Sequence, residues 1–202
     1  MSFLLGLTGG IGMGKSTAAG MFRQMGHPVW DADAAVHALY ALGGAAVGPV
    51  GAAFPEAVRD GAVDRGALKS ALAAEPDGFA RLEKIVHPLV AADRAAFVAA
   101  HAGAPMVVLD IPLLFEGGLQ AGMDGVAVVS VPAEVQRARV LARPGMNEAG
   151  LRMILARQMP DAEKRRLADW VIPTDSMEGA RAAIMDICAR IMARQAHARD
   201  RS

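Results

Sequence analysis

The sequence predicts an α/β fold in which helices flank a parallel sheet of five strands. Short apolar runs, typical of buried strands, alternate with stretches whose apolar residues recur at helical spacing. A glycine-rich loop joins the first apolar run to the first helical stretch, as expected where a strand leads into a crossover helix. The expected strands are residues 3–8, 29–33, 106–110, 126–131 and 170–172.

Length and composition indicate one globular domain. The chain has 202 residues, of which 53% are hydrophobic, and Lys plus Arg equals Asp plus Glu at 21 each, so no basic excess favours nucleic-acid binding. No apolar run of about 18 residues and no signal peptide are visible. We therefore expect a cytoplasmic protein without a membrane segment, as a monomer or weak homo-oligomer. Cys188 is the single cysteine, and its spacing from nearby isoleucines predicts burial in a helix.

Residues 9–16, with the sequence GGIGMGKS, carry the most specific motif, because they match the phosphate-binding P-loop G-x-x-x-x-G-K-S. Its glycines let the backbone fold around an anion with the N–H groups pointing inward. Lys15 is predicted to reach the phosphates of ATP, and the Ser16 hydroxyl to bind Mg²⁺. The predicted nucleotide-binding residues are Gly12, Met13, Gly14, Lys15, Ser16 and Thr17.

Carboxylates follow two of the predicted strands. Asp31 and Asp33 end the second strand, and ligands of open α/β sheets bind at the carboxyl ends of strands. Asp33 also precedes a helical stretch, so it is a candidate both for capping that helix and for catalysis; the two roles can coexist, and the local pattern leaves both open. Asp110 ends the third strand, where P-loop proteins place an aspartate that supports Mg²⁺ directly or through water.

The chain between and after these strands divides into three predicted parts. A mainly helical insertion covers residues 63–100, with its helical spacing interrupted at Pro88. An arginine-bearing helix–turn–helix predicts a lid over the nucleotide phosphates at residues 144–162; the alternative is a solvated charged face. The core takes residues 1–62, 101–143 and 163–202. The charged run 161–166 is predicted to lie on the surface, and the polar end, 194–202, to fray.

The motif set favours a small phosphoryl-transfer kinase over other P-loop proteins. A D-x-x-G switch and an N-K-x-D guanine signature are both absent from the sequence, which argues against a GTPase. Two alternatives remain open beside a kinase for the acceptor discussed next. They are a kinase for another small molecule, such as a nucleoside or nucleotide, and a non-catalytic ATP-binding module.

Taken in order, the motifs of this chain resemble those of the dephospho-CoA kinases. They are GLTGGIGMGKST at residues 6–17, DAD at 31–33, IVHP at 85–88, PLLFE at 112–116 and AD at 168–169, with weaker likeness in VDR at 63–65 and E-x-Q-x-x-R at 134–139. The likeness runs from about residue 5 to residue 172. Met13 departs from the small polar residue frequent in the family and is expected to crowd the loop slightly. The segment 172–174, IPT, replaces a more polar run.

This resemblance implies ATP-dependent phosphorylation of the ribose 3′-hydroxyl of dephospho-CoA, the last step of coenzyme A biosynthesis. It also implies a nucleotide core, a helical acceptor-binding region and a lid. Asp33 is predicted to orient the acceptor hydroxyl and take its proton, with Asp31 as the alternative base. Arg143 is the favoured lid arginine for neutralising charge on the transferred group. The residues predicted to bind the acceptor are Asp33, His87, Leu114 and Glu116.

Overall fold

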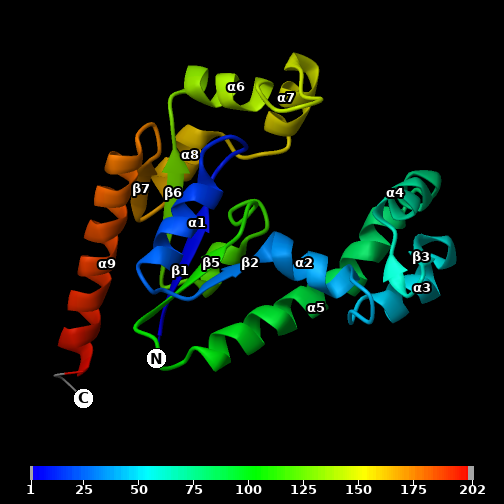
Figure 1. Cartoon of the computed structure of the whole chain (residues 1–202), viewed down its shortest axis with the longest axis horizontal. Helices are drawn as coiled ribbons and strands as arrows, with labels where there is room; N and C mark the ends of the chain where they lie inside the picture. The colour runs from blue at the N-terminus through cyan, green and yellow to red at the C-terminus, as the bar shows by residue number, and fades with distance from the viewer. Residues whose placement is uncertain (1, 200–202) are drawn as a thin grey trace. The chain divides into compact units, whose positions relative to one another are not determined.

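The computed structural model describes residues 2–199, which form two compact units (Figure 1). Within the described residues, the first unit comprises residues 2–30 and 101–199, and the second comprises Asp31–Ala100. The second unit therefore interrupts the first along the chain. It includes residues 31–62, which the sequence analysis assigned to the core, together with the whole predicted insertion.

A five-stranded parallel sheet organises the first unit, which confirms the predicted fold class. The strand order is β2-β5-β1-β6-β7, so β1 lies at the centre with β5 on one side and β6 on the other. In β1, Leu5 lies opposite both Val108 of β5 and Gly125 of β6. The strand bounds are β1 Phe3–Thr8, β2 Val29–Asp31, β5 Met106–Asp110, β6 Gly125–Ser130 and β7 Trp170–Pro173.

The core of the first unit lies between the sheet and two helices, α1 and α9. The side chains of Leu5, Phe22 and Ile184 are completely buried there. Cys188 of α9 is buried in the same cluster, as predicted, and burial raises the pKa of its thiol. The remaining helices of this unit follow β5 or β6. The bounds are α1 Lys15–Gln24, η2 Leu119–Gly122, α6 Ala133–Leu141, α7 Glu148–Leu155, α8 Asp161–Leu167 and α9 Met177–Arg199.

Two predictions about charged or polar segments of the first unit can be compared with the structure. The run 161–166 was expected on the surface, and four of its six residues are exposed in α8, but Lys164 is completely buried. The polar end was expected to fray from residue 194, yet residues 194–199 continue α9. The rest of that prediction, residues 200–202, lies outside the described residues.

The second unit has a hydrophobic core of its own. Leu39, Val50, Phe54, Leu68 and Leu72 contribute to this core, and Val50 is completely buried. The unit is mainly helical, with a small two-stranded sheet. The bounds are α2 Ala32–Tyr40, α3 Val47–Ala53, η1 Pro55–Ala57, β3 Val58–Arg59, β4 Ala62–Val63, α4 Arg65–Ala74 and α5 Gly78–Ala100.

The small sheet corrects the predicted start of the helical insertion at residue 63, because that residue lies in a strand. Strands β3 and β4 pair in antiparallel fashion, with Val58 opposite Val63. Asp60 and Gly61 turn the chain with positive φ values of 50° and 75°, the conformation that two-residue hairpins require. The helix therefore starts later, at Arg65, where Asp64 caps it by accepting a hydrogen bond from the Ala67 N–H at 2.9 Å.

Helix α5 corrects a second prediction, because it continues through Pro88 instead of being interrupted there. A proline inside a helix lacks the N–H that would bond to the carbonyl four residues earlier, here that of Lys84. Both Lys84 and Pro88 are exposed, so solvent can replace the missing hydrogen bond. Among residues 2–199, no helix combines the length and the apolar character needed to cross a membrane.

Candidate phosphate-binding site

The glycine-rich loop connects β1 to α1, and its backbone has the conformation that the motif requires. Gly12 and Gly14 have φ values of 76° and 84°, in the left-handed region that favours glycine. Gly14 immediately precedes α1, so the helix starts at Lys15 and presents the unpaired N–H groups of its first turn to the loop. Ser16 and Thr17 in that turn are exposed. The loop, Lys15 and the positive end of α1 thus form a suitable anion site.

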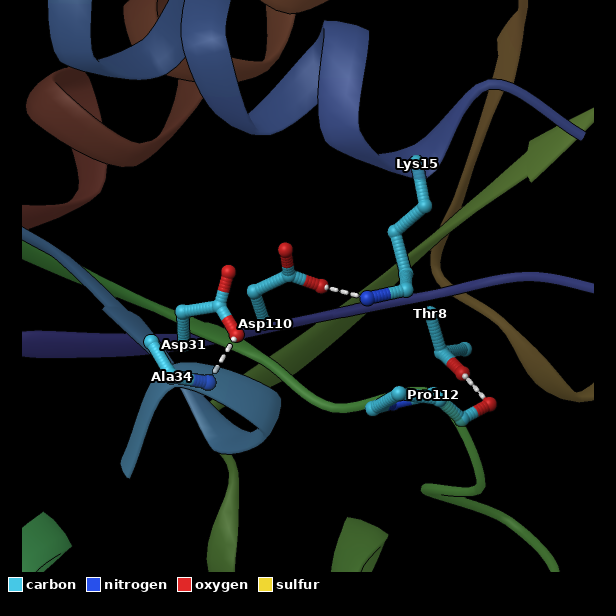
Figure 2. Close-up of polar contacts among 6 residues, drawn as sticks. All are labelled: Thr8, Lys15, Asp31, Ala34, Asp110 and Pro112. Carbon is cyan, nitrogen blue, oxygen red and sulfur yellow. Dashed lines mark hydrogen bonds and ion pairs between the residues drawn. The ribbon is translucent and has the colours of Figure 1, made fainter. Parts of the chain in front are cut away.

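Lys15 forms an ion pair with Asp110, the last residue of β5 (Figure 2). The Asp110 side chain is only 2% exposed, while that of Lys15 is 15% exposed. An ammonium group carries three N–H donors, so Lys15 can bind both this carboxylate and a phosphate oxygen. Nearby, the Thr8 hydroxyl at the end of β1 donates to the Pro112 carbonyl at 3.0 Å, which ties β1 to the segment after β5.

The donor set fits a magnesium ion that is shared with phosphates. No group of three or more His, Cys, Asp or Glu side chains suited to a metal ion occurs within residues 2–199, so these side chains do not form a protein-only site. Ser16 offers an exposed hydroxyl and Asp110 a carboxylate, both oxygen ligands of the kind that Mg²⁺ binds. Mg²⁺ usually completes its coordination with water and substrate phosphates, so these two residues remain the predicted metal site.

Met13 does not crowd the phosphate side of the loop, contrary to expectation. Its side chain is 2% exposed and belongs to the core of the first unit. Its sulfur accepts a hydrogen bond from the Val131 N–H at 3.3 Å. A long apolar side chain is tolerated here because it points away from the anion site and adds to the core.

Several side chains outside the motif hold the loop backbone, and sequence reasoning did not predict these contacts. Gln136 of α6 donates from Nε2 to the Ile11 carbonyl at 2.8 Å. Gln158, after α7, accepts from the Ile11 N–H at 3.0 Å. The Thr174 hydroxyl, which follows β7, donates to the Met13 carbonyl at 2.6 Å. The only sequence signal was that Gln136 lies in the E-x-Q-x-x-R motif.

The predicted arginine-bearing helix–turn–helix is formed by α6 and α7, and residues 144–162, the predicted lid, include part of the turn and α7. Arg137 and Glu148 form an ion pair across the turn, and Asn147 caps α7 by accepting from the Gly150 N–H at 2.9 Å. Arg143 lies in the turn with an exposed side chain, and within the described chain its guanidinium has no hydrogen bond or ion pair. Its charge is therefore available for a ligand. Arg152 in α7 is also exposed.

Two of the residues predicted to bind the acceptor are engaged inside the first unit. Leu114 is completely buried, and its Cδ1 would lie 2.6 Å from a Cβ added to Gly6. Glu116 Oε1 lies 2.8 Å from Lys164 Nζ and accepts a hydrogen bond from the Met159 N–H at 2.8 Å. Burial favours the neutral acid, but the Lys164 and backbone contacts outweigh it and lower the Glu116 pKa.

The second unit carries the other candidate residues. Asp31 caps α2 by accepting from the Ala34 N–H at 3.0 Å, so the helix cap is Asp31 and not Asp33 (Figure 2). Asp33 lies in the first turn of α2 with an exposed side chain, which leaves its carboxylate unused by the cap. His87 is exposed on α5. Of the two functions left open for Asp33, capping is thus excluded.

Comparison with known proteins identifies the family. A sequence model described as dephospho-CoA kinase matches residues 3–178. The chain belongs to the dephospho-CoA kinase family. Among relatives with this name, the dephospho-CoA kinase of Cereibacter sphaeroides is 59% identical over 94% of this chain and 95% of its own length. The enzyme of Ruegeria pomeroyi is 56% identical over 98% of this chain and 100% of its own length.

Solved structures agree with the fold described above. A crystal structure of a Thermus thermophilus protein is 34% identical, covers 94% of this chain and 97% of its own, and has a TM-score of 0.79. The dephospho-CoA kinase of Campylobacter jejuni covers 95% of this chain and 98% of its own with a TM-score of 0.71, at 22% identity. The second comparison supports the fold alone. Together with the family match, the relatives confirm the resemblance seen in the motifs.

Proposed function

We propose that this member of the dephospho-CoA kinase family transfers the γ-phosphoryl group of ATP to the ribose 3′-hydroxyl of dephospho-CoA, giving coenzyme A and ADP. The proposal rests on one observation. In this member of the family, Lys15 of the P-loop is paired with the buried carboxylate of Asp110, at the end of the neighbouring strand. We propose a cytoplasmic enzyme that acts on these two small molecules.

In this proposal the backbone N–H groups of residues 12–17 and the Lys15 ammonium bind the ATP phosphates. The left-handed conformations of Gly12 and Gly14 support this role, as does the start of α1 at Lys15. Ser16, with Asp110, would hold Mg²⁺. When bound there, Mg²⁺ would neutralise part of the negative charge of the phosphates. The protein's own contribution is to fix the phosphates in one orientation before transfer.

We assign the role of catalytic base to Asp33. A ribose hydroxyl is a weak nucleophile, and a carboxylate that accepts a hydrogen bond from it both aims the oxygen and takes its proton. Asp33 is exposed and free of the capping role, which supports the assignment. Asp31 is the weaker candidate because its Oδ1 already accepts the capping hydrogen bond from Ala34.

Arg143 supplies the positive charge that stabilises the transferred phosphoryl group in this scheme. Its exposed guanidinium, in the turn between α6 and α7, supports the role. Residues 144–162 act as the lid and exclude water, which limits hydrolysis of ATP. Residues 63–100 contribute to acceptor binding, with His87 as the contact that we favour. Leu114 and Glu116 shape the segment 112–116 that borders the acceptor.

The test is ADP release from the purified protein with ATP and Mg²⁺, measured with and without dephospho-CoA, and with the product identified by mass. We expect a rate that depends on dephospho-CoA and a product heavier by one phosphoryl group. Lys15→Ala provides the inactive control, because it removes the ammonium that contacts the phosphates. If a nucleoside or nucleotide were a better acceptor than dephospho-CoA, the proposed substrate would be wrong.

A further inference from the structure

Two peptide groups of the P-loop are held from outside by buried side chains. The Gln136 amide donates to the Ile11 carbonyl at 2.8 Å, and the Thr174 hydroxyl donates to the Met13 carbonyl at 2.6 Å. Gln136 is 8% exposed and Thr174 is 7% exposed. Neither residue belongs to the P-loop motif. They come from α6 and from the segment after β7.

Peptide geometry gives these two contacts a consequence on the opposite side of the loop. In a planar trans peptide the C=O and the following N–H point in opposite directions, and the described chain has no cis peptide. Fixing the Ile11 carbonyl therefore directs the Gly12 N–H away from Gln136. Fixing the Met13 carbonyl directs the Gly14 N–H away from Thr174 in the same way.

Without such contacts, fewer restraints would fix the orientation of these peptides. Gly12 and Gly14 have positive φ values, and glycine reaches several backbone conformations at little cost. Close packing reinforces the side-chain contacts. A Cβ at Gly12 would lie 2.5 Å from Val140 Cγ2, and one at Gly14 would lie 2.8 Å from Thr174 Oγ1. The loop backbone therefore packs directly against α6 and against Thr174.

Arg139 fixes the direction of the Thr174 hydrogen bond. Its guanidinium donates to the Thr174 carbonyl at 2.7 Å and to the Thr174 hydroxyl oxygen at 3.4 Å. A guanidinium can only donate, so the hydroxyl oxygen acts as acceptor toward Arg139 and its proton goes to the Met13 carbonyl. The hydrogen bonds thus run in one direction, from the Arg139 guanidinium through the Thr174 hydroxyl to the Met13 carbonyl.

We propose that Gln136 and Thr174 are positioning residues for the nucleotide: they orient the Gly12 and Gly14 N–H groups toward the ATP phosphates. The Ile11 N–H is not part of this set, because Gln158 already accepts from it. The inference rests on the proposed function, since the ligand of these N–H groups is the polyphosphate of ATP. It adds two residues that act through the backbone instead of touching the nucleotide.

The test compares Thr174→Val, Thr174→Ser and Gln136→Met with the wild-type chain. Valine keeps the shape of threonine without the hydroxyl, serine keeps the hydroxyl, and methionine keeps the length of glutamine without its N–H donors. Calorimetry with ADP should show a dissociation constant about tenfold higher for Thr174→Val and Gln136→Met, as for one lost hydrogen bond, and near wild type for Thr174→Ser. In turnover assays the KM for ATP should rise while the KM for dephospho-CoA does not.

A control separates positioning from general loss of stability. Ile187→Val removes a methyl group from α9, where the side chain is 2% exposed and has no group that could form a hydrogen bond with the loop. This variant should lower the melting temperature without changing the affinity for ADP. The inference would be overturned if ADP affinity were unchanged in both Thr174→Val and Gln136→Met. It would also be overturned if Thr174→Ser and Thr174→Val lost affinity equally. Neither result would affect the proposed function. Absence of ADP binding by the wild-type chain would overturn the proposed function and the inference with it.

Discussion

Lys164 Nζ lies 2.8 Å from Glu116 Oε1, and the Lys164 side chain is completely buried. Glu116 belongs to the segment after β5, whereas Lys164 lies in α8, after the predicted lid. The Met159 N–H donates to the same carboxylate oxygen. One carboxylate therefore links the segment after β5 to α8 and to Met159, which precedes α8. A buried ammonium depends strongly on its anionic partner, because burial removes its hydration.

The first prediction concerns this ion pair. Glu116→Gln should lower the free energy of unfolding by about 3 kcal/mol, because it leaves the buried Lys164 ammonium without its counter-charge. Adding Lys164→Met should recover most of that loss. Urea unfolding of the two variants measures both effects. Arg165→Ala removes an exposed pair with Asp161 and, as control, should change stability by less than about 1 kcal/mol. Equal stability of Glu116→Gln and wild type would contradict the prediction.

The second prediction concerns how the stabilisation by the Glu116–Lys164 ion pair depends on pH. The folded state lowers the Glu116 pKa below its ordinary value of 4.5, so the folded protein favours the ionised form. The stabilisation is therefore complete above that ordinary value and disappears as the pH falls through the folded-state pKa. The stability difference between wild type and Glu116→Gln should be constant from pH 7 to pH 6 and should shrink below pH 4.5. A difference that grew on acidification would be inconsistent with this sign.

The third prediction tests the catalytic base. Asp33→Asn should reduce kcat by 10²- to 10⁴-fold, because the amide cannot accept the proton of the acceptor hydroxyl. Binding of ADP should stay within about twofold of wild type. Asp31→Asn provides the matched control: asparagine is also a good helix cap, so stability and turnover should change little. Near-normal turnover of Asp33→Asn would show that another group takes the proton.

The fourth prediction asks which lid arginine matters. Arg143→Met should lower kcat by about 10²- to 10³-fold, because it removes charge that stabilises the transition state. Arg152→Met, which removes another exposed arginine, this one from α7, should have a much smaller effect. Steady-state rates at saturating substrates separate the two. The reverse order of effects would move the assignment from Arg143 to Arg152.

The fifth prediction uses Cys188 as a probe of the α9 packing. Burial raises the thiol pKa, so at pH 7.5 the group is protonated and shielded, and iodoacetamide should modify it very slowly. In denaturant the single cysteine should take up one equivalent, as judged by mass. A shorter α9 core side chain, such as in Ile184→Ala, should speed the native reaction. Rapid modification of the native wild-type chain would mean that α9 opens readily.

The sequence predicted those parts of the fold that depend on local pattern. The five strands and the start of α1 follow from apolar runs and from the P-loop, whose spacing fixes where the helix begins. The hairpin at Asp60 and Gly61 was missed although Asp-Gly between two valines is a strong turn signal. Pro88 was expected to interrupt the helix, but α5 continues through it because an exposed helix face tolerates the lost hydrogen bond.

What the sequence did not predict depends on partners that are distant in the chain. Thr174 and Met13 are 161 residues apart, so nothing local indicates that one holds the other. Lys164 sits in a run of charges that favours the surface, and only the folded chain shows Glu116 beside it. The roles of Asp33, Arg143 and His87 rest on family resemblance and chemistry, and they stay predictions until the variants are measured.

The interruption of the first unit has a consequence for how a ribosome makes this protein. Strand β1 lies at the centre of the sheet, yet both of its neighbours, β5 and β6, are encoded after the entire second unit. Synthesis runs from the N-terminus, so residues 31–100 emerge with their own core complete while β1 still has no partner strand. The second unit can thus finish folding before the first unit. The nascent chain must keep the apolar β1 from aggregating until residue 130 has been added.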